Sequence, residues 1–298
     1  MPSRVNELVV QILSILAPGA CLALVGLAWE RRGPAFPLDF VTTLVVNVSL
    51  PALLFHTLAT AVVSLDALAT LALATLAVHL VFAPIVVSLL RAAGKDWRLS
   101  VAHVVGNTGN LGLPVCLLAF GDEGLAYAMT FFAVQCVLLF TVGEAIYAGS
   151  ADLRRALESP ILHAIWLGLL VRVLDVPVPA FAMETLRLLG QIVIPLMLIT
   201  LGVSLAGMRA ASLGSSVLWA TVRTGLAIGV GFAIAALFGL EGVARGVLVI
   251  ETAVPVAVFN FLLAEKHGRD SAEVSGLILV THLGAVLYLP LLLGVLLG

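Results

Sequence analysis

Four prolines in this sequence each follow a polar side chain by four residues. The pairs are Asn47 with Pro51, Asn110 with Pro114, Gln191 with Pro195, and Glu251 with Pro255. Proline cannot donate to the carbonyl four residues earlier, and its ring displaces that carbonyl, so a helix kinks or breaks there. A polar side chain beside the freed carbonyl makes a local polar nest that can hold an ion or a small polar molecule. Ordinary proline kinks with chance polar neighbours remain the alternative, with more weight for the Asn47 and Gln191 pairs.

The elements that carry these pairs are expected to be membrane-spanning helices. Apolar residues make up 61% of the 298 positions and charged residues 11%, against about 45–50% and about 25% in an average soluble domain. A spanning helix needs about 20 mostly apolar residues. The runs are continuous rather than alternating, which favours helices over a barrel. The sequence predicts an all-α polytopic protein with ten spans, near 8–28, 38–60, 64–90, 99–120, 125–148, 157–174, 184–206, 213–238, 243–265 and 272–297.

Basic residues predict the orientation of these spans. Loops rich in Lys and Arg stay in the cytoplasm, and ten basic residues lie in the odd-numbered loops: Arg31, Arg32, Arg91, Lys95, Arg98, Arg154, Arg155, Arg209, Lys266 and Arg269. Both termini are therefore expected outside a cell membrane, either a plasma membrane or a bacterial inner membrane. The first apolar run is long and begins after Glu7, so it is interpreted as a span rather than a signal peptide. The lipid bilayer is the expected environment, and no nucleic-acid partner is expected.

The four pairs fall into two sets that repeat along the chain. The Asn47 and Gln191 pairs are offset by 144 residues, and the Asn110 and Glu251 pairs by 141. Ten spans divide into two repeats of five, residues 1–150 and 151–298, which would be oppositely oriented. Interrupted segments at corresponding positions of two inverted halves are typical of the binding site of a secondary transporter.

The segment from His103 to Pro114 is the most irregular of the predicted spans. It holds three glycines and three Asn or Thr side chains. Irregular backbone at membrane depth is tolerated only where it is buried in protein or lines a cavity. If the span around Pro255 also breaks, two helix N-termini meet near the midplane, each with about half a positive charge. Such ends form a binding site for an anion.

Four stretches of the sequence resemble the auxin efflux carrier family, which includes the plant PIN carriers and many bacterial relatives. They are residues 49–57, 107–114, 135–141 and 251–265, and Arg223 and residues 239–242 also match the family's pattern. The resemblance covers nearly the whole chain in order. The long cytoplasmic loop of many plant members is absent, which favours a bacterial-type member. More distantly, the chain is similar to the bile-acid and sodium symporters.

This resemblance implies an elevator-type carrier, commonly a homodimer, with spans 1, 2, 6 and 7 as scaffold and spans 3–5 and 8–10 as a moving transport unit. Spans 4 and 9 would cross at their prolines. Asn107 would contact the carboxylate of a small organic anion, and Gln135 would line the same pocket. The other candidate binding residues are Thr108, Asn110, Pro114, Pro255 and Asn260, and the candidate hinge or scaffold residues are Asn47, Pro51, Gln191 and Pro195.

Glu251 departs from the plant relatives, which have a neutral amide at this place. A carboxylate in mid-membrane is costly and marks an ion or proton pathway. We hypothesise that Glu251 couples transport to a proton or to sodium, with Asn110 as a further sodium ligand; a neutral Glu bonded to the broken backbone is the alternative. Arg223 is a further candidate for the coupling site and needs a partner, either Glu251 or a freed carbonyl; a structural ion pair and substrate binding are both open roles for it. His103 and His282 are candidate proton relays, against the alternative of satisfied interior histidines.

The predicted function is secondary transport of small organic anions, without a cofactor beyond the coupling ion. A passive anion channel or uniporter could be built from the same broken helices. An intramembrane lipid-modifying enzyme is the other alternative, but the chain has no HExxH, paired Asp, GxSxG or phosphate-loop motif, so no catalytic residue is expected. Cys21, Cys116 and Cys136 show neither CxxC spacing nor a histidine pairing, so no transition-metal site is expected.

Overall fold

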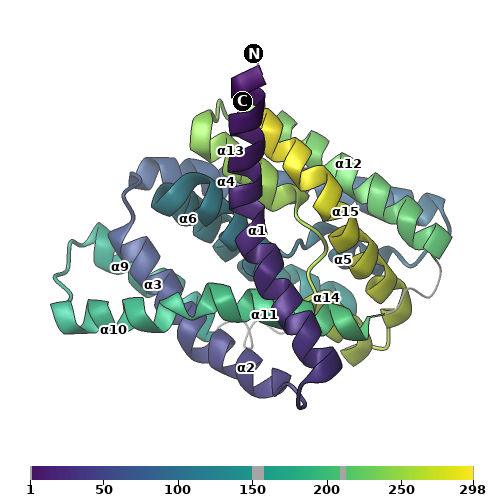
Figure 1. Cartoon of the computed structure of the whole chain (residues 1–298), viewed down its shortest axis with the longest axis horizontal. Coiled ribbons are helices and arrows are strands. Elements are labelled where there is room, and N and C mark those ends of the chain that lie inside the picture. The colour runs from purple at the N-terminus through teal and green to yellow at the C-terminus, as the bar shows by residue number, and fades with distance from the viewer. Residues whose placement is uncertain (1, 150–157, 209–212, 298) are drawn as a thin grey trace.

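A computed structural model describes residues 2–149, 158–208 and 213–297 of the chain (Figure 1). Every regular element within these ranges is a helix, so the predicted all-α class is confirmed. The basic residues Arg154, Arg155 and Arg209, and the joint between the two predicted repeats at 150 and 151, lie outside the described residues.

Seven helical stretches of the described ranges are long and apolar enough to cross a membrane: Val9–Arg32, Leu38–Thr60, Leu65–Ala92, Thr108–Ala148, Ala180–Gly207, Leu213–Leu237 and Ser271–Leu297. The chain is therefore a multi-pass membrane protein. Three of them are α4 (Leu65–Ala92), α12 (Leu213–Leu237) and α15 (Ser271–Leu297), and the first belongs to α1 (Pro2–Arg32).

Two of these stretches are jointed at a proline. The first consists of α2 (Leu38–Leu44), the π-helical turn η1 (Val45–Ser49) and α3 (Leu50–Thr60), and the second of α10 (Ala180–Gln191) and α11 (Val193–Gly207). Because a π turn tolerates a missing hydrogen bond, the chain passes Pro51 without leaving the helix. Pro195 follows a one-residue turn at Ile192.

The stretch Thr108–Ala148 turns back on itself. It contains η3 (Thr108–Gly112), α6 (Leu113–Leu138), η4 (Leu139–Gly143) and α7 (Glu144–Ala148). Within α6 the backbone leaves the helical conformation at Gly121, where φ is 66°. A Cβ at Gly124 would lie 2.5 Å from the carbonyl oxygen of Cys116. This tight turn separates the spans predicted at 99–120 and 125–148.

The remaining helices are shorter than a membrane span. They are η2 (Trp97–Leu99), α5 (Ser100–Val104), α9 (Pro160–Val173), α13 (Gly242–Ala253) and α14 (Phe259–Lys266). The span predicted at 243–265 therefore consists of two helices with a non-helical segment between them.

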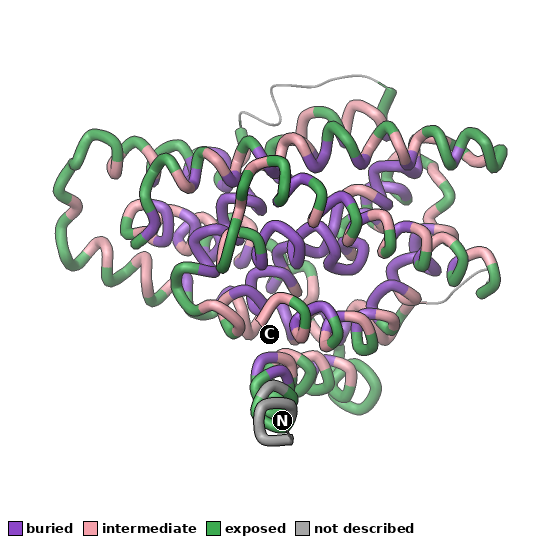
Figure 2. The backbone as a smooth tube through the Cα atoms, turned by 90° about the horizontal axis from the view of Figure 1, so that it is seen from above, coloured by how far each residue is buried: buried purple, intermediate pink, exposed green. Residues whose placement is uncertain are grey.

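Helix α1 crosses α11 at very short range, and it lies at one edge of the molecule (Figures 1 and 2). A Cβ at Gly26 would lie 1.9 Å from the carbonyl oxygen of Ile199, and one at Gly202 would lie 1.8 Å from that of Ala23. Only glycine fits at either position. Small residues at the crossing point are how helices approach closely in a bilayer.

Buried residues gather in the centre of the molecule, as Figure 2 shows, and many of the helices carry exposed large apolar side chains. Examples are Leu13, Leu73, Trp166, Phe181 and Leu287. Such faces are stable where hydrocarbon is the solvent, which fits the membrane placement.

Candidate functional site

Two non-helical segments from the two halves of the chain pair with each other in the interior. Helix α5 ends at Val104 and η3 begins at Thr108, while α13 ends at Ala253 and α14 begins at Phe259. Gly106 and Val256 form an antiparallel bridge. The backbone amide of Asn107 donates to the carbonyl of Pro255 over 2.6 Å, and the backbone amide of Ala257 donates to the carbonyl of Val105 over 3.1 Å. Four helix ends therefore meet at this pair of segments, which we call the crossing (residues 105–107 and 254–258).

Arg223 of α12 binds both helix C-termini at the crossing. Its side chain is 1% exposed. Nε donates to the carbonyl of His103 over 2.9 Å, and Nη1 donates to those of Ala253 and Val254 over 3.2 and 2.5 Å. Carbonyls at a helix C-terminus are unsatisfied and partially negative, so a guanidinium stabilises them. Of the two partners considered for Arg223, the structure places the freed carbonyls around it.

The two helix N-termini at the crossing differ from the C-termini, because no side chain in the described part of the chain binds them. No side chain of the described residues caps η3 after Asn107 or α14 after Val258. Helix η3 continues directly into α6, so its start carries the dipole of a longer helix. A Cβ at Gly109 would lie 3.0 Å from Cε of Met197 in α11. The uncapped positive end of η3 thus lies beside α11.

Amide and hydroxyl side chains surround the crossing. Nε2 of Gln135 donates to the carbonyl of Gly106 over 3.0 Å and to Oγ1 of Thr108 over 2.7 Å. Nδ2 of Asn260 donates to the carbonyl of Val105 over 3.0 Å. Gln135, Thr108 and Asn260, all predicted as site residues, therefore lie together. Asn110 is half-buried in η3, and Pro114 is buried in the first turn of α6.

Thr281 was not predicted as a site residue. Its Oγ1 accepts a hydrogen bond from the amide of Val256 over 3.2 Å, so it holds the second segment of the crossing. Its position beside His282 was the only sequence signal for it.

Asn107 and His282 form a direct pair. Nδ2 of Asn107 lies 3.0 Å from Nε2 of His282, and Nδ1 of His282 lies 2.8 Å from the carbonyl oxygen of Ile278. A carbonyl only accepts, so the network assigns the ring proton to Nδ1 and makes Nε2 the acceptor of the Asn107 amide. The ring of His103 contacts neither Asn107 nor His282 in these bonds and lies edge-on to Trp219, at 5.5 Å between centroids.

Glu251 occupies a closed slot beside the crossing. Its side chain is 1% exposed, and Oε1 lies 3.7 Å from the thiol of Cys116. Within the described ranges Oε2 has no hydrogen-bond partner. A Cβ at Gly112 would lie 2.1 Å from Oε2, so the carboxyl group rests on the backbone of η3. A buried carboxylate with an unpartnered oxygen is costly, and a bound proton or small cation would lower that cost.

The other two proline pairs lie away from the crossing. Asn47 is exposed in η1, and its Nδ2 donates to the carbonyl of Thr43 over 3.0 Å. Gln191 is exposed at the end of α10, and Pro195 is half-buried in α11. Thus only two of the four pairs, at Asn110 and Glu251, contribute to the buried polar centre.

A cavity of about 270 Å³ lies among η1, η4, α7, α9 and α14. It is lined by Val46, Phe140, Glu144, Ser159, Ile161, Phe259, Leu263 and Lys266. Nζ of Lys266 lies 2.8 Å from Oε1 of Glu144 at this cavity. The cavity extends from this ion pair to Phe259, the first residue of α14.

The helices and the crossing define a multi-pass membrane protein with a buried polar centre made from both halves of the chain. The family described as membrane transport protein matches residues 33–152 and 148–293. The chain therefore belongs to that family, the auxin efflux carrier group, and the predicted resemblance is confirmed.

Two archaeal relatives carry the same description in their names. An uncharacterized transporter of Methanothermobacter thermautotrophicus is 28% identical over 301 residues, covering 96% of each chain. An uncharacterized transporter of Methanocaldococcus jannaschii is 27% identical over 214 residues, covering 66% of this chain and 68% of the relative. The description of the family and the names of both relatives indicate a transporter.

Proposed function

We propose that this protein is a secondary transporter of small organic anions that carry a carboxylate. The observation that carries the proposal is the asymmetry of the crossing. Arg223 neutralises the negative helix C-termini, whereas the positive N-termini of η3 and α14 have no side-chain cap. A site with uncapped N-terminal dipoles and neutralised C-terminal ones favours an anion.

The substrate carboxylate lies, in this proposal, at the N-terminus of η3 beside Asn107 and Thr108, with Gln135 and Asn260 completing the polar lining. Asn107 has an amide held by His282, so its orientation is fixed before the substrate arrives. The cavity that begins at the Lys266 and Glu144 pair and reaches Phe259 is the route to this site. Its aromatic and aliphatic walls suit the hydrocarbon part of an organic acid.

The proposed architecture has ten membrane-spanning segments in two inverted repeats of five. Segments 1, 2, 6 and 7 form the scaffold: α1, α2 to α3, α9, and α10 to α11. The remaining helices form the moving transport unit, including both segments of the crossing. The packing supports this division, because α1 lies on α11, α3 lies on α9 and α10, and α12 lies on α13, α15 and α4. A homodimer joined through the scaffold completes the proposal.

Glu251 is the proposed coupling residue, for either a proton or a sodium ion. Support comes from its buried slot and from the unpartnered Oε2 beside the backbone of η3. A cation bound here would lie in the same helix pair as the carboxylate site, so the two charges would move together as one neutral cargo. The cost of moving charge through the bilayer falls when opposite charges travel paired.

Uptake into proteoliposomes tests the transporter proposal. A panel of radiolabelled carboxylates, including malonate and an indole-type acid, is offered with an imposed proton or sodium gradient. We expect one member to accumulate above its external concentration and to leak out when the gradient is collapsed. Equilibration without accumulation would instead indicate a passive channel or uniporter, and a chemically altered product would indicate an enzyme.

A further inference from the structure

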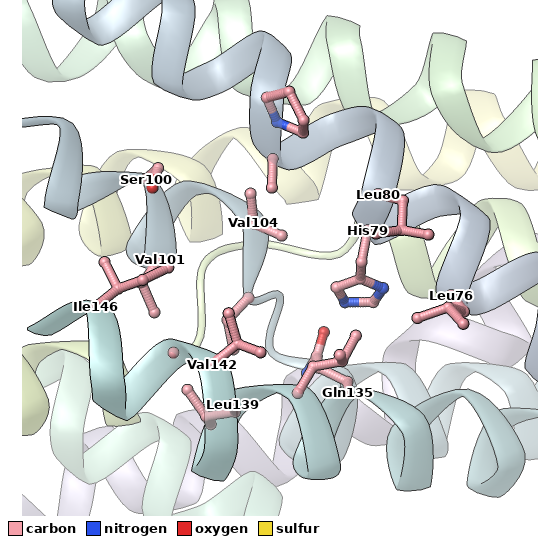
Figure 3. A pocket seen from close by; sticks show the side chains of 15 residues that line it. Leu76, His79, Leu80, Ser100, Val101, Val104, Gln135, Leu139, Val142 and Ile146 are labelled. Carbon is pink, nitrogen blue, oxygen red and sulfur yellow. The ribbon is translucent and has the colours of Figure 1, made fainter. Parts of the chain in front are cut away.

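A second cavity, of about 240 Å³, lies between α4, α5 and the end of α6 with η4 and α7, away from the scaffold helices (Figure 3). Only His79, Ser100 and Gln135 among its lining residues carry a polar side chain. The amide of Gln135 already donates to Gly106 and Thr108, and Nδ1 of His79 lies 2.8 Å from the carbonyl oxygen of Thr75. The rest of the lining is Leu76, Leu80, Ala83, Pro84, Val101, Val104, Val105, Leu138, Leu139, Val142, Gly143 and Ile146. The walls therefore offer hydrocarbon.

The cavity opens toward the bilayer interior. Its lining residues Leu80 and Pro84 of α4 and Val142 of η4 are exposed on the outer face. Residues 76–84 lie in the middle of α4, which has 28 residues and is about 42 Å long at 1.5 Å per residue. Water does not fill an apolar cavity stably, and an empty one forfeits dispersion contacts. A hydrocarbon chain is the occupant that the surroundings supply.

The cavity also has a direction. It runs from His79 and Gln135, near the middle of the membrane, to Ser100 and Ile146 at the loop-side ends of α5 and α7. Beyond that end, the exposed Arg91 lies seven residues after Pro84 and therefore on the same face of α4.

A cationic and aromatic cluster lies at this loop-side end. The guanidinium carbons of Arg91 and Arg98 lie 5.3 and 5.4 Å from the ring centroid of Trp97. Tryptophan and arginine in this arrangement are typical of the headgroup level of a membrane, where basic side chains attract anionic lipids.

We propose that one acyl chain of an anionic phospholipid occupies this cavity, with the lipid phosphate beside Arg91 and Arg98. The chain would run in the ordinary direction of a bilayer lipid, from a headgroup at the loop side to a terminal methyl near Gln135. It would pack on Val104, the last residue of α5, and on Val105, the first residue of the crossing, and would support them from the lipid side. The proposal requires the membrane placement of the protein and not its transport activity.

Photochemical labelling in nanodiscs tests the occupant directly. The discs contain phosphatidylglycerol with a diazirine in the distal half of one acyl chain, and labelled peptides are identified by mass spectrometry. We expect label on Val101, Val105 or Gln135, which are buried from the outer surface but line the cavity. Ala102, which follows Val101 in α5 and is also buried but does not line the cavity, should stay unlabelled. Label confined to outward residues such as Leu73 and Leu80 would overturn the proposal.

Two pairs of substitutions, each a variant with its control, test the site further. Ala83→Phe fills the cavity and should abolish label on Val105, whereas Ala72→Phe on the same helix, outside the lining, should leave it unchanged. Arg91→Gln should lower the labelling by phosphatidylglycerol about fivefold, toward the level given by a phosphatidylcholine analogue, because one basic residue near the surface contributes about 1 kcal/mol, whereas Arg32→Gln should not. Since Arg91 lies outside the packed interior, this variant tests the site even if Ala83→Phe fails to fold. Equal labelling of the unmodified protein by the two lipids, or persistent Val105 label in Ala83→Phe, would contradict the proposal.

Discussion

Individual side chains at the crossing were easier to single out than their partners. Arg223 and Glu251 stood out in the sequence because charged side chains in apolar segments are costly, whereas Asn107 and Gln135 were expected from the resemblance to the auxin efflux carrier family. Their partners come from distant parts of the chain: Arg223 binds carbonyls 120 and 31 residues away. No local pattern encodes such a choice. For that reason the sequence left the partner of Arg223 open between Glu251 and a carbonyl, and it missed Thr281.

Glu251→Gln should uncouple the transporter. The neutral amide keeps the shape of the side chain in its slot but can neither release a proton nor neutralise sodium, so uptake should lose its dependence on the driving gradient while substrate exchange continues. Proteoliposome uptake at several pH and sodium values measures this. Glu184→Gln is the control, since Glu184 is exposed and bonded to Arg187. Unchanged gradient dependence in Glu251→Gln would remove Glu251 from the coupling role.

Gly112→Ala should displace the carboxyl group of Glu251. The new Cβ would lie 2.1 Å from Oε2, so η3 or the side chain must shift, at a cost of about 1–3 kcal/mol. Thermal unfolding in detergent should show a lower midpoint, and coupling should weaken. Gly229→Ala in α12 meets open space and should behave like the unmodified protein. A Gly112→Ala variant as stable and as well coupled as Gly229→Ala would show that the slot is not tight.

At the scale of elements, hydropathy predicted the helices well and their interruptions less well. Long apolar runs such as 64–90 became single helices, and α4 continues through Pro84 without a break. Proline alone did not separate a kink from a break: Pro51 is absorbed by a π turn, whereas the chain around Pro255 is extended. The difference arises because the crossing segments gain hydrogen bonds from each other, which compensates for the lost helical ones.

Arg223→Lys should destabilise the crossing. A lysine has one compact ammonium group and cannot reach the C-termini of α5 and α13 with the geometry of a guanidinium fork. At least one buried carbonyl would then lack its partner, which costs about 1–3 kcal/mol. Thermal unfolding and uptake should both decline, whereas Arg245→Lys, at an exposed site in α13 away from the crossing, should change neither. Equal stability of the two variants would contradict the assigned role.

Gly202→Ala should separate α1 from α11. A Cβ there would lie 1.8 Å from the carbonyl oxygen of Ala23, whereas one at Gly207, on the same helix, would meet open space. We expect a large loss of thermal stability for Gly202→Ala and almost none for Gly207→Ala. If both variants unfold at the same temperature, the close approach of these two helices is not required for stability.

The whole molecule combines a confirmed class with a proposed motion. The helical membrane class and the transport family follow from composition and motifs, because both depend on properties distributed over the entire chain. Movement of one group of helices against another depends on a difference between two states. The ion pair of Lys95 with Glu273, 2.6 Å apart, joins the loop after α4 to the first turn of α15 and favours motion of the proposed transport unit as a rigid body.

Cross-linking between the two groups should stop transport. Val46 and Leu263 line opposite sides of the cavity between the proposed scaffold and transport unit. Cysteines at both positions, in a background without native cysteines and joined by a short reducible reagent, should block uptake until reduced. The control joins cysteines at positions 95 and 273, within the transport unit, and should leave uptake intact. Full uptake with Val46 and Leu263 joined would exclude a motion between these helices.

Anion binding at the uncapped start of η3 is the central claim, and titration calorimetry tests it most directly. The carboxylate found in the uptake panel is titrated into purified protein, Asn107→Ala and the exposed control Asn47→Ala. Loss of one charge-assisted hydrogen bond, about 1.5–3 kcal/mol, predicts a Kd raised about 10- to 100-fold in Asn107→Ala and unchanged in Asn47→Ala. An unaltered Kd in Asn107→Ala would contradict the account.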